Sequence, residues 1–157
     1  MSDTQNINPT QTLEINGEPA PLAEFNQDTF LQSNKKTTTD YRAAFAQAIG
    51  TTGTIAKIVK MAFGIAGETD EQGNPAPPTD NGPLNNVVLT KNIKEVTYPV
   101  ETSVCFEAEI EAGEYTGAIN EVALIDEQEQ TAAKMRLLTS KGVDAESGAI
   151  FKWTVEF

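Results

Sequence analysis

This sequence contains no histidine and a single cysteine, Cys105. Histidine is the commonest general base and the commonest metal ligand, so its absence excludes Ser-His-Asp and Cys-His catalysis within the chain. One cysteine cannot form a disulfide within the chain, so no oxidising compartment is implied. Basic residues are also few, with 11 Lys and Arg against 23 Asp and Glu, for a net charge of −12. A chain this acidic repels nucleic acid and anionic membranes over most of its surface.

Long hydrophobic runs are missing as well. The first residues, Met1 to Asn6, are polar and acidic, and they lack the basic and apolar regions of a signal peptide. No apolar run approaches the roughly 20 residues of a transmembrane helix. We therefore expect a protein that is soluble and cytoplasmic at synthesis, with neither membrane nor nucleic acid among its partners.

The N-terminal part of the chain, residues 1–38, is rich in Thr, Gln, Asn and Pro and carries few large apolar side chains. Such segments are often disordered alone and can become ordered on a partner. The short run from Thr12 to Asn16 is a candidate strand within it. The sequence predicts an extended or disordered N-terminal arm over 1–38 and one β domain over 39–157.

One short helix is predicted at about residues 40–49. Asp40 is its candidate N-cap, and Gly50 is the candidate left-handed residue that ends it. Apolar residues recur along it at helical spacing, at Tyr41, Ala44, Phe45, Ala48 and Ile49. We expect this stripe to lay the helix on a sheet.

The rest of the chain alternates between apolar and polar residues, which is typical of half-buried strands. Turn residues separate the strand-like runs, which cover 54–65, 87–90, 93–98, 103–110, 114–126, 133–138 and 149–157. A helix is the competing interpretation of 54–65, but its glycines and β-branched residues favour a strand. The pattern predicts a mainly β fold, an antiparallel β-sandwich-like domain of about six or seven strands.

Two of these runs indicate how the core is built. In the last run, one face carries Phe151, Trp153, Val155 and Phe157. In the run over 114–126, Ile119, Ala123 and Ile125 are assigned to one face and Val122 and Leu124 to the other. Both faces are therefore apolar, which predicts a central strand. Trp153 is interpreted as a core residue rather than as a platform for ligand stacking.

Candidate chemical groups are few. Glu107 and Glu109 form a carboxylate pair that suits acid–base work, but a solvated outer strand face explains them better. Cys105 is expected on the same outward face, with no histidine and no cationic neighbour to lower its pKa. Glu114 and Glu121 have no partner that the sequence reveals.

Two loops were considered as ligand sites. Gly64-Ile-Ala-Gly67 lacks the Lys-Ser/Thr ending and the following helix of a phosphate-binding loop. The long acidic loop over 66–86 lacks the alternating oxygen ligands and closing Glu of an EF-hand, so a solvated or partner-contacting loop is favoured over calcium. The sequence therefore predicts no catalytic residue, no metal or cofactor site, and no enzymatic activity.

Several segments occur in an order that resembles a known family. They are a strand ending in Ala62-Phe-Gly64, a loop with Pro75, Pro77, Pro78 and Pro83, then Val96–Val100, Val104–Ile110, Gly117–Asp126 and Phe151–Phe157. Over about residues 40–157 the chain is similar to small tail-structural proteins of tailed bacteriophages, in particular to the collar-type N-terminal domain by which tail fibres attach to a baseplate. That domain carries an Ile-x-Glu-hydrophobic-Gly-Leu-Tyr-Asp strand and turn. Ile119–Asp126 fits this motif with Ala123 in place of Gly and Ile125 in place of Tyr.

The resemblance implies a virion structural protein of the tail, at the baseplate or at the fibre attachment. It would assemble with tail, baseplate or fibre subunits, and with further copies of itself. Because no fibre repeats follow Phe157, we expect a stand-alone adaptor or baseplate subunit. The family works through interfaces, so the resemblance assigns no site residues.

Two alternative functions remain open from the sequence. One is a capsid decoration or head-fibre protein that clamps the capsid. The other is a carbohydrate-binding β-sandwich module, which requires exposed aromatic side chains beside acidic or amide groups.

Overall fold

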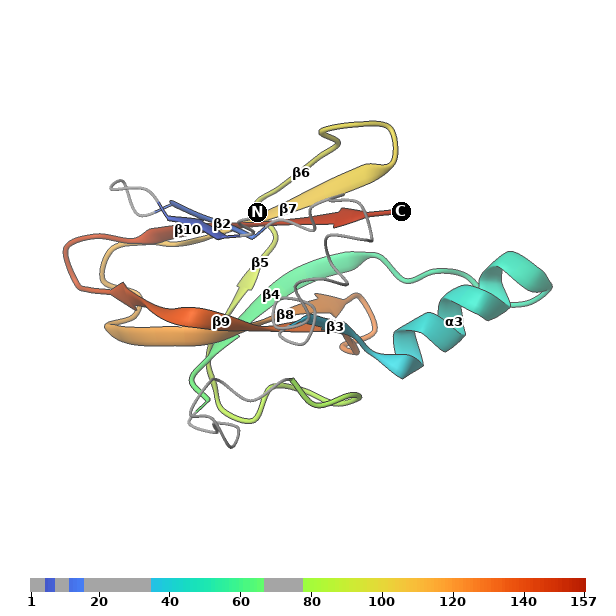
Figure 1. The fold of residues 1–157 in the computed structure, drawn as a ribbon, viewed down its shortest axis with the longest axis horizontal. Helices are drawn as coiled ribbons and strands as arrows, with labels where there is room; N and C mark the ends of the chain where they lie inside the picture. Colours follow the sequence, from blue (N-terminus) through green and yellow to red (C-terminus); the bar gives the residue numbers. More distant parts are fainter. Residues whose placement is uncertain (1–4, 8–11, 16–34, 67–77) are drawn as a thin grey trace.

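Two β-sheets packed face to face form the protein (Figure 1), in a computed structural model that describes residues 5–7, 12–15, 35–66 and 78–157. In spatial order, sheet A consists of β1 (Gln5–Ile7), β2 (Thr12–Ile15), β10 (Ala149–Glu156), β7 (Ser103–Ile110) and β6 (Glu95–Thr97). In the same way, sheet B consists of β3 (Lys35–Thr37), β9 (Thr131–Val143), β8 (Gly117–Asp126), β4 (Ile58–Gly64) and β5 (Val87–Asn92). The predicted mainly β, sandwich-like fold is confirmed.

Neighbouring strands run antiparallel throughout both sheets, with the exception of β2 and β10, which are parallel. The ten strands of the described residues exceed the predicted number. Three of them, β1, β2 and β3, belong to the segment 1–38, for which the sequence predicts an arm, and they lie toward the sheet edges. The rest of that segment lies outside the described residues, apart from Thr38.

The core lies between the two sheets. Phe63 of sheet B and Phe151 of sheet A are fully buried, with ring centroids 4.7 Å apart at an interplanar angle of 50°. This tilted arrangement suits the quadrupoles of two aromatic rings. Around them pack the alternate residues of the inner strand faces, among them Met61, Ala108, Ile110, Val122, Leu124, Met135 and Trp153.

Strand β8 is central in sheet B and apolar on both faces, as predicted. The predicted grouping of its side chains is wrong in one respect. Ile119 packs in the core with Val122 and Leu124 rather than on the Ala123 face. The register of β8 against β9 shifts between Ile119 and Glu121. Such a bulge inserts a residue and reverses the alternation on one side of it.

The run predicted over 54–65 is a strand, but β4 begins only at Ile58. Met61 and Phe63 belong to the core, whereas Ala62 faces the outer side of sheet B, as the alternation predicts. The helical interpretation of this run is therefore excluded.

The single helix of the described residues, α3 (Thr39–Gly50), forms where the sequence predicts it, but its caps differ. The N-cap is Thr38, not Asp40, because the Thr38 hydroxyl accepts from the Tyr41 amide at 3.2 Å. Gly50 is the last helical residue and Thr51 is the C-cap, in a non-left-handed conformation. In the described part of the chain, no helix has the length and apolar character needed to cross a membrane.

The expectation that α3 lies on a sheet is wrong. The helix projects past one end of the sandwich (Figure 1), and none of its residues is buried. Its apolar stripe is half-buried along Tyr41, Ala44, Phe45 and Ala48, while Ile49 is 71% exposed. The stripe therefore faces the end of the sandwich rather than a sheet face.

We expect replacement of Thr38 by valine to destabilise the fold. The buried Thr38 hydroxyl donates to the Thr131 carbonyl at 2.8 Å and accepts from the Tyr41 amide at the start of α3. Loss of the hydroxyl leaves that carbonyl and that amide without this partner. The expected loss is about 1–3 kcal/mol in the free energy of unfolding, measured by urea denaturation. Thr38→Ser keeps the hydroxyl and serves as the control. Equal losses in both variants would show that packing, not hydrogen bonding, anchors the helix.

Candidate functional site

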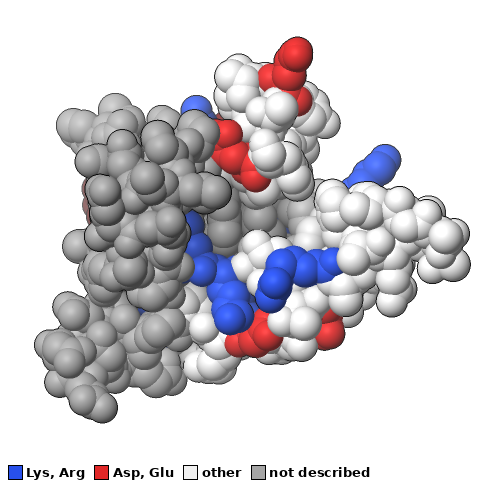
Figure 2. All heavy atoms as spheres, turned by 45° about the vertical axis from the view of Figure 1, so that its right-hand side comes forward, with Lys and Arg blue, Asp and Glu red and all other residues white. Residues whose placement is uncertain are grey.

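A cleft of about 850 Å³ opens between the two sheets at the end nearest α3. Phe106, Leu124 and Trp153 form its floor, and all three are buried. The space-filling view shows this end of the molecule as hollowed beside the helix (Figure 2). The sandwich is therefore not closed by its own side chains at this end.

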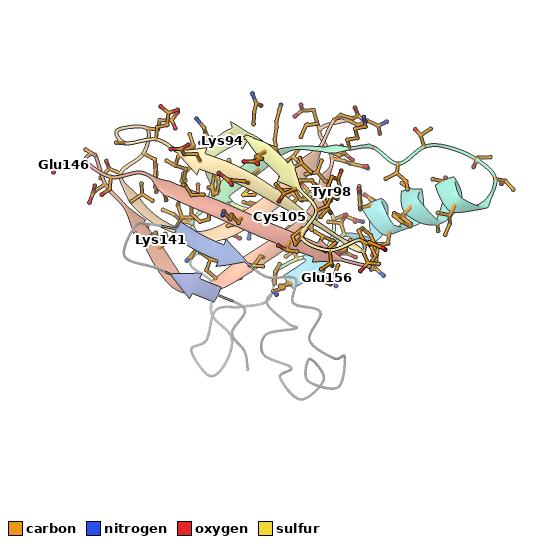
Figure 3. All side chains as sticks on the ribbon, turned by 90° about the horizontal axis from the view of Figure 1, so that it is seen from above. Lys94, Tyr98, Cys105, Lys141, Glu146 and Glu156 are labelled. Atoms are coloured by element: carbon orange, nitrogen blue, oxygen red, sulfur yellow. The ribbon has the colours of Figure 1, made fainter. Side chains whose placement is uncertain are left out.

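Exposed apolar side chains surround the mouth of the cleft. Ile55 is 41%, Val96 42%, Tyr98 72% and Phe157 77% exposed, and all four line the cleft. Seen from above, Tyr98 lies at the end near the helix, and Glu146 lies at the opposite end (Figure 3). A cleft with exposed apolar side chains around its mouth is the kind of surface that suits an interaction site.

Helix α3 contributes the side wall of the cleft. The ring of Phe45 stacks on that of Phe157, with centroids 6.2 Å apart and an interplanar angle of 19°. The Tyr41 hydroxyl donates to the Ala56 carbonyl at 3.3 Å. Burial, and next the charge of Asp126, raise the pKa of Tyr41. These contacts attach the helix to the C-terminus and to the segment before β4.

The N-terminus of α3 is held by a segment far away in sequence. Asp80 accepts from the Thr39 amide at 2.8 Å and also from the Thr39 hydroxyl, and Asn81 accepts from the Asp40 amide at 2.9 Å. These bonds satisfy amides that a helix leaves unpaired. Hydrogen bonds from Thr39 are the main cause of the lowered pKa of Asp80, followed by the charges of Lys36 and Arg42.

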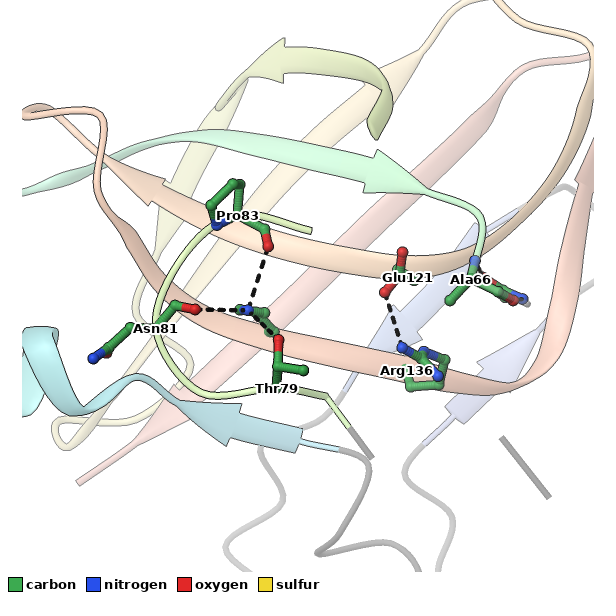
Figure 4. Close-up of polar contacts among 8 residues, drawn as sticks. Ala66, Thr79, Asn81, Pro83, Glu121 and Arg136 are labelled. Atoms are coloured by element: carbon green, nitrogen blue, oxygen red, sulfur yellow. Dashed lines mark hydrogen bonds and ion pairs between the residues drawn. The ribbon is translucent and has the colours of Figure 1, made fainter. Parts of the chain in front are cut away.

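The same segment is anchored to sheet B by a buried lysine. The Lys134 side chain, on the outer face of β9, is 2% exposed. Its ammonium donates to the Thr79 hydroxyl at 2.8 Å and to the carbonyls of Asn81 and Pro83, each at 3.4 Å (Figure 4). Burial lowers the pKa of Lys134, opposed by the charges of Glu121 and Asp80. The Lys134 ammonium thus holds in place the segment whose Asp80 and Asn81 accept hydrogen bonds from the first amides of α3.

A second buried charge lies on the same face of sheet B. Glu121 on β8 and Arg136 on β9 are paired in register, with Glu121 Oε1 3.1 Å from Arg136 Nη2 (Figure 4). Gly64 is the residue of β4 that pairs with Glu121. A glycine is needed there because a Cβ would approach the Asn86 carbonyl oxygen to 2.5 Å. Removing one partner of such a buried pair leaves a charge uncompensated, which destabilises the sheet.

The candidates considered in the sequence do not meet at one site. Glu107 and Glu109 are half-exposed on β7, away from the cleft, and Glu109 forms an ion pair with Lys94. Cys105 keeps the outward side of β7 that the alternation predicts, since Phe106 and Ala108 pack in the core and Cys105 does not, but it is only 8% exposed. Glu114 pairs with Lys91 at 2.7 Å, and Glu121 with Arg136, partners that the sequence does not reveal.

The loop predictions are tested only in part. Residues 67–77, which belong to the acidic loop considered for calcium, lie outside the described residues. Within the described residues, no group of three or more His, Cys, Asp or Glu side chains is placed to hold a metal ion. Trp153 is a core residue as predicted, and its ring also forms part of the cleft floor.

Comparisons with protein-family models, with curated proteins and with solved structures found no match.

Sequence reasoning missed the cleft and the Lys134 anchor. The exposed positions Tyr98 and Phe157 each continue an alternating apolar pattern, so they read as core residues. One signal was present, since Lys134 stands inside an otherwise apolar run, Ala133-Lys-Met. A lysine in a buried strand requires oxygen partners.

We expect Lys134→Met to loosen the helix as well as the segment at 78–86. The variant leaves the Thr79 hydroxyl and the carbonyls of Asn81 and Pro83 without their hydrogen-bond donor. The free energy of unfolding should therefore fall by about 1–3 kcal/mol. Hydrogen exchange should accelerate at residues 78–86 and at 39–41. Lys152→Met, at a half-buried lysine on sheet A, is the control. Unchanged exchange at 39–41 would contradict the link from Lys134 to the helix.

Proposed function

We propose that this protein is a structural subunit of a bacteriophage tail, at the baseplate or fibre attachment, and that it acts by docking to neighbouring subunits. The observation that carries the docking role is the open end of the sandwich. There an apolar cleft, bordered by the exposed side chains of Tyr98 and Phe157, lies beside a projecting helix. An assembly partner that covers this end would remove that apolar surface from water.

The tail assignment rests on the resemblance of Ile119–Asp126 to the collar-type motif. In the fold, this run is the central strand β8 and its turn. Glu121 forms the buried ion pair, and Asp126 accepts from the amides of Gln128 and Gln130 in the turn. The motif therefore has a structural role here, and of its residues Leu124 lines the docking surface, at the floor of the cleft.

The alternative placement is on the capsid, as a decoration or head-fibre protein, and it uses the same docking chemistry. A carbohydrate-binding role fits less well. Tyr98 is an exposed aromatic, but the described residues that line the cleft are mostly apolar or basic, with Glu156 as the one acidic side chain among them. Sugar sites require more acidic or amide partners than this.

The test is quantitative mass spectrometry of purified particles separated into head and tail fractions. The proposal expects the protein to co-fractionate with tails at a fixed ratio to a known tail subunit, and that ratio reports the symmetry. Enrichment in heads would favour the decoration alternative. Absence from both fractions would overturn the structural role in the virion.

A further inference from the structure

The cleft carries basic side chains that form no ion pair with an acidic residue of the described chain. Lys36, Arg42 and Lys57 line it and are exposed. Among the described residues, no carboxylate lies within ion-pair distance of these three side chains. In a chain with 23 acidic and 11 basic residues, exposed cations would be expected to find acidic neighbours.

Elsewhere in the described chain, basic side chains are ion-paired or withdrawn from water. Lys60 pairs with Glu129, Lys91 with Glu114, Lys94 with Glu109 and Arg136 with Glu121. Lys134 and Lys141 are buried, and Lys152 is half-buried. The unpaired exposed cations are therefore concentrated at the cleft, where Figure 2 shows Lys and Arg atoms gathered.

The nearby polar groups leave this positive charge available. Arg42 donates to the Thr37 carbonyl at 3.3 Å and to the Thr39 hydroxyl at 3.1 Å, both neutral oxygens. The carboxylate of Asp80 accepts hydrogen bonds from Thr39, and its charge attracts Lys36 and Arg42 without an ion-pair contact. Of the acidic residues that the structure describes, only Glu156 lines the cleft. The apolar cleft is thus bordered by net positive charge on a protein of net charge −12.

From this pattern we infer that the cleft binds an extended, acidic protein segment that places large apolar side chains on the floor and carboxylates against Lys36, Arg42 and Lys57. The inference rests on the proposed docking function and names the chemistry of the partner. Charge complementarity of this kind sets partner choice and association rate.

An edge strand beside the cleft favours an extended segment. Strand β3, which carries Lys36, lines the cleft and is the last strand of sheet B among the described residues. Edge strands accept further extended chains.

The spread of the cations favours a chain over a small amphiphile. Lys36 is on β3, Arg42 on α3 and Lys57 just before β4. A fatty acid has one carboxylate and would meet one of these positions. Several carboxylates along one segment would meet all three.

The inference is tested with a synthetic peptide of alternating glutamate and leucine, titrated into the full chain. Trp153 is the only tryptophan and lies on the cleft floor, so its fluorescence reports occupancy. We expect saturable binding that weakens with salt and is absent for the lysine–leucine peptide. Binding of a serine–leucine peptide as tight as that of the glutamate peptide would overturn the role of charge.

Matched variants separate charge from apolar contact. The Lys36→Glu/Lys57→Glu double variant should weaken binding about tenfold or more, roughly 1.4 kcal/mol. Lys152→Glu, a charge reversal away from the cleft, should leave it unchanged. Ile55→Ser, at the rim, should weaken binding, while Ile49→Ser, at an exposed isoleucine outside the cleft, should not. Equal effects of the cleft variants and their controls would overturn the inference.

Two further measurements identify other occupants. Sedimentation velocity of the protein alone would reveal self-association; if the double variant abolishes it, the acidic segment belongs to a second copy, which supports the inference. Oleate that changes Trp153 fluorescence when the acidic peptide does not would overturn it.

Failure of peptide binding in a protein that still co-fractionates with tails would reject this partner chemistry and leave the proposed function standing. Peptide binding by a protein absent from particles would reject the proposed function instead.

Discussion

The buried ammonium of Lys134 is the contact on which the arrangement of the cleft depends. Its hydrogen bonds gather the segment around Thr79–Pro83 on the outer face of sheet B. That segment presents Asp80 and Asn81 to the first amides of α3, and Thr38, which caps the helix, donates its hydroxyl to the Thr131 carbonyl of β9. A helix of 12 residues has little stability alone. Fixed at its N-terminus, it stands beyond the sandwich and supplies the wall of the cleft.

The position of the helix explains why one end of the sandwich stays open. Its apolar stripe faces Phe157 and the segment before β4 instead of covering a sheet. Trp153 and Phe106 are covered by the cleft walls, while Tyr98 and Phe157 remain in water. An acidic chain gains solubility from its charge, and this allows it to expose apolar surface at one place. The basic side chains at that place distinguish it from the rest of the surface.

The sequence predicts the parts of this structure that depend on local periodicity. Alternation identified β4, β7, β8 and β10, and helical spacing identified α3 within one residue at each end. Local periodicity could not predict the features that depend on contacts between residues distant in sequence. The bulge after Ile119 moved that residue to the other face, and a helix cap at Thr38 was chosen over Asp40 because Thr131 lies within reach. The cleft was hidden for the same reason, since Tyr98 and Phe157 have the periodicity of core residues but lie where the opposing layer ends.

The central claim is that a partner covers the open end of the sandwich. The most direct test places a photo-crosslinking amino acid at Tyr98, on the rim of the cleft, and at Val87, which is exposed on β5 outside it. Irradiation of assembled particles that contain the protein is followed by identification of crosslinked peptides. The account predicts crosslinks from position 98 to a neighbouring subunit, through a segment that carries acidic residues, and few or none from position 87. Crosslinks from position 87 alone would show that the open end faces solvent in the assembly, and would contradict the account.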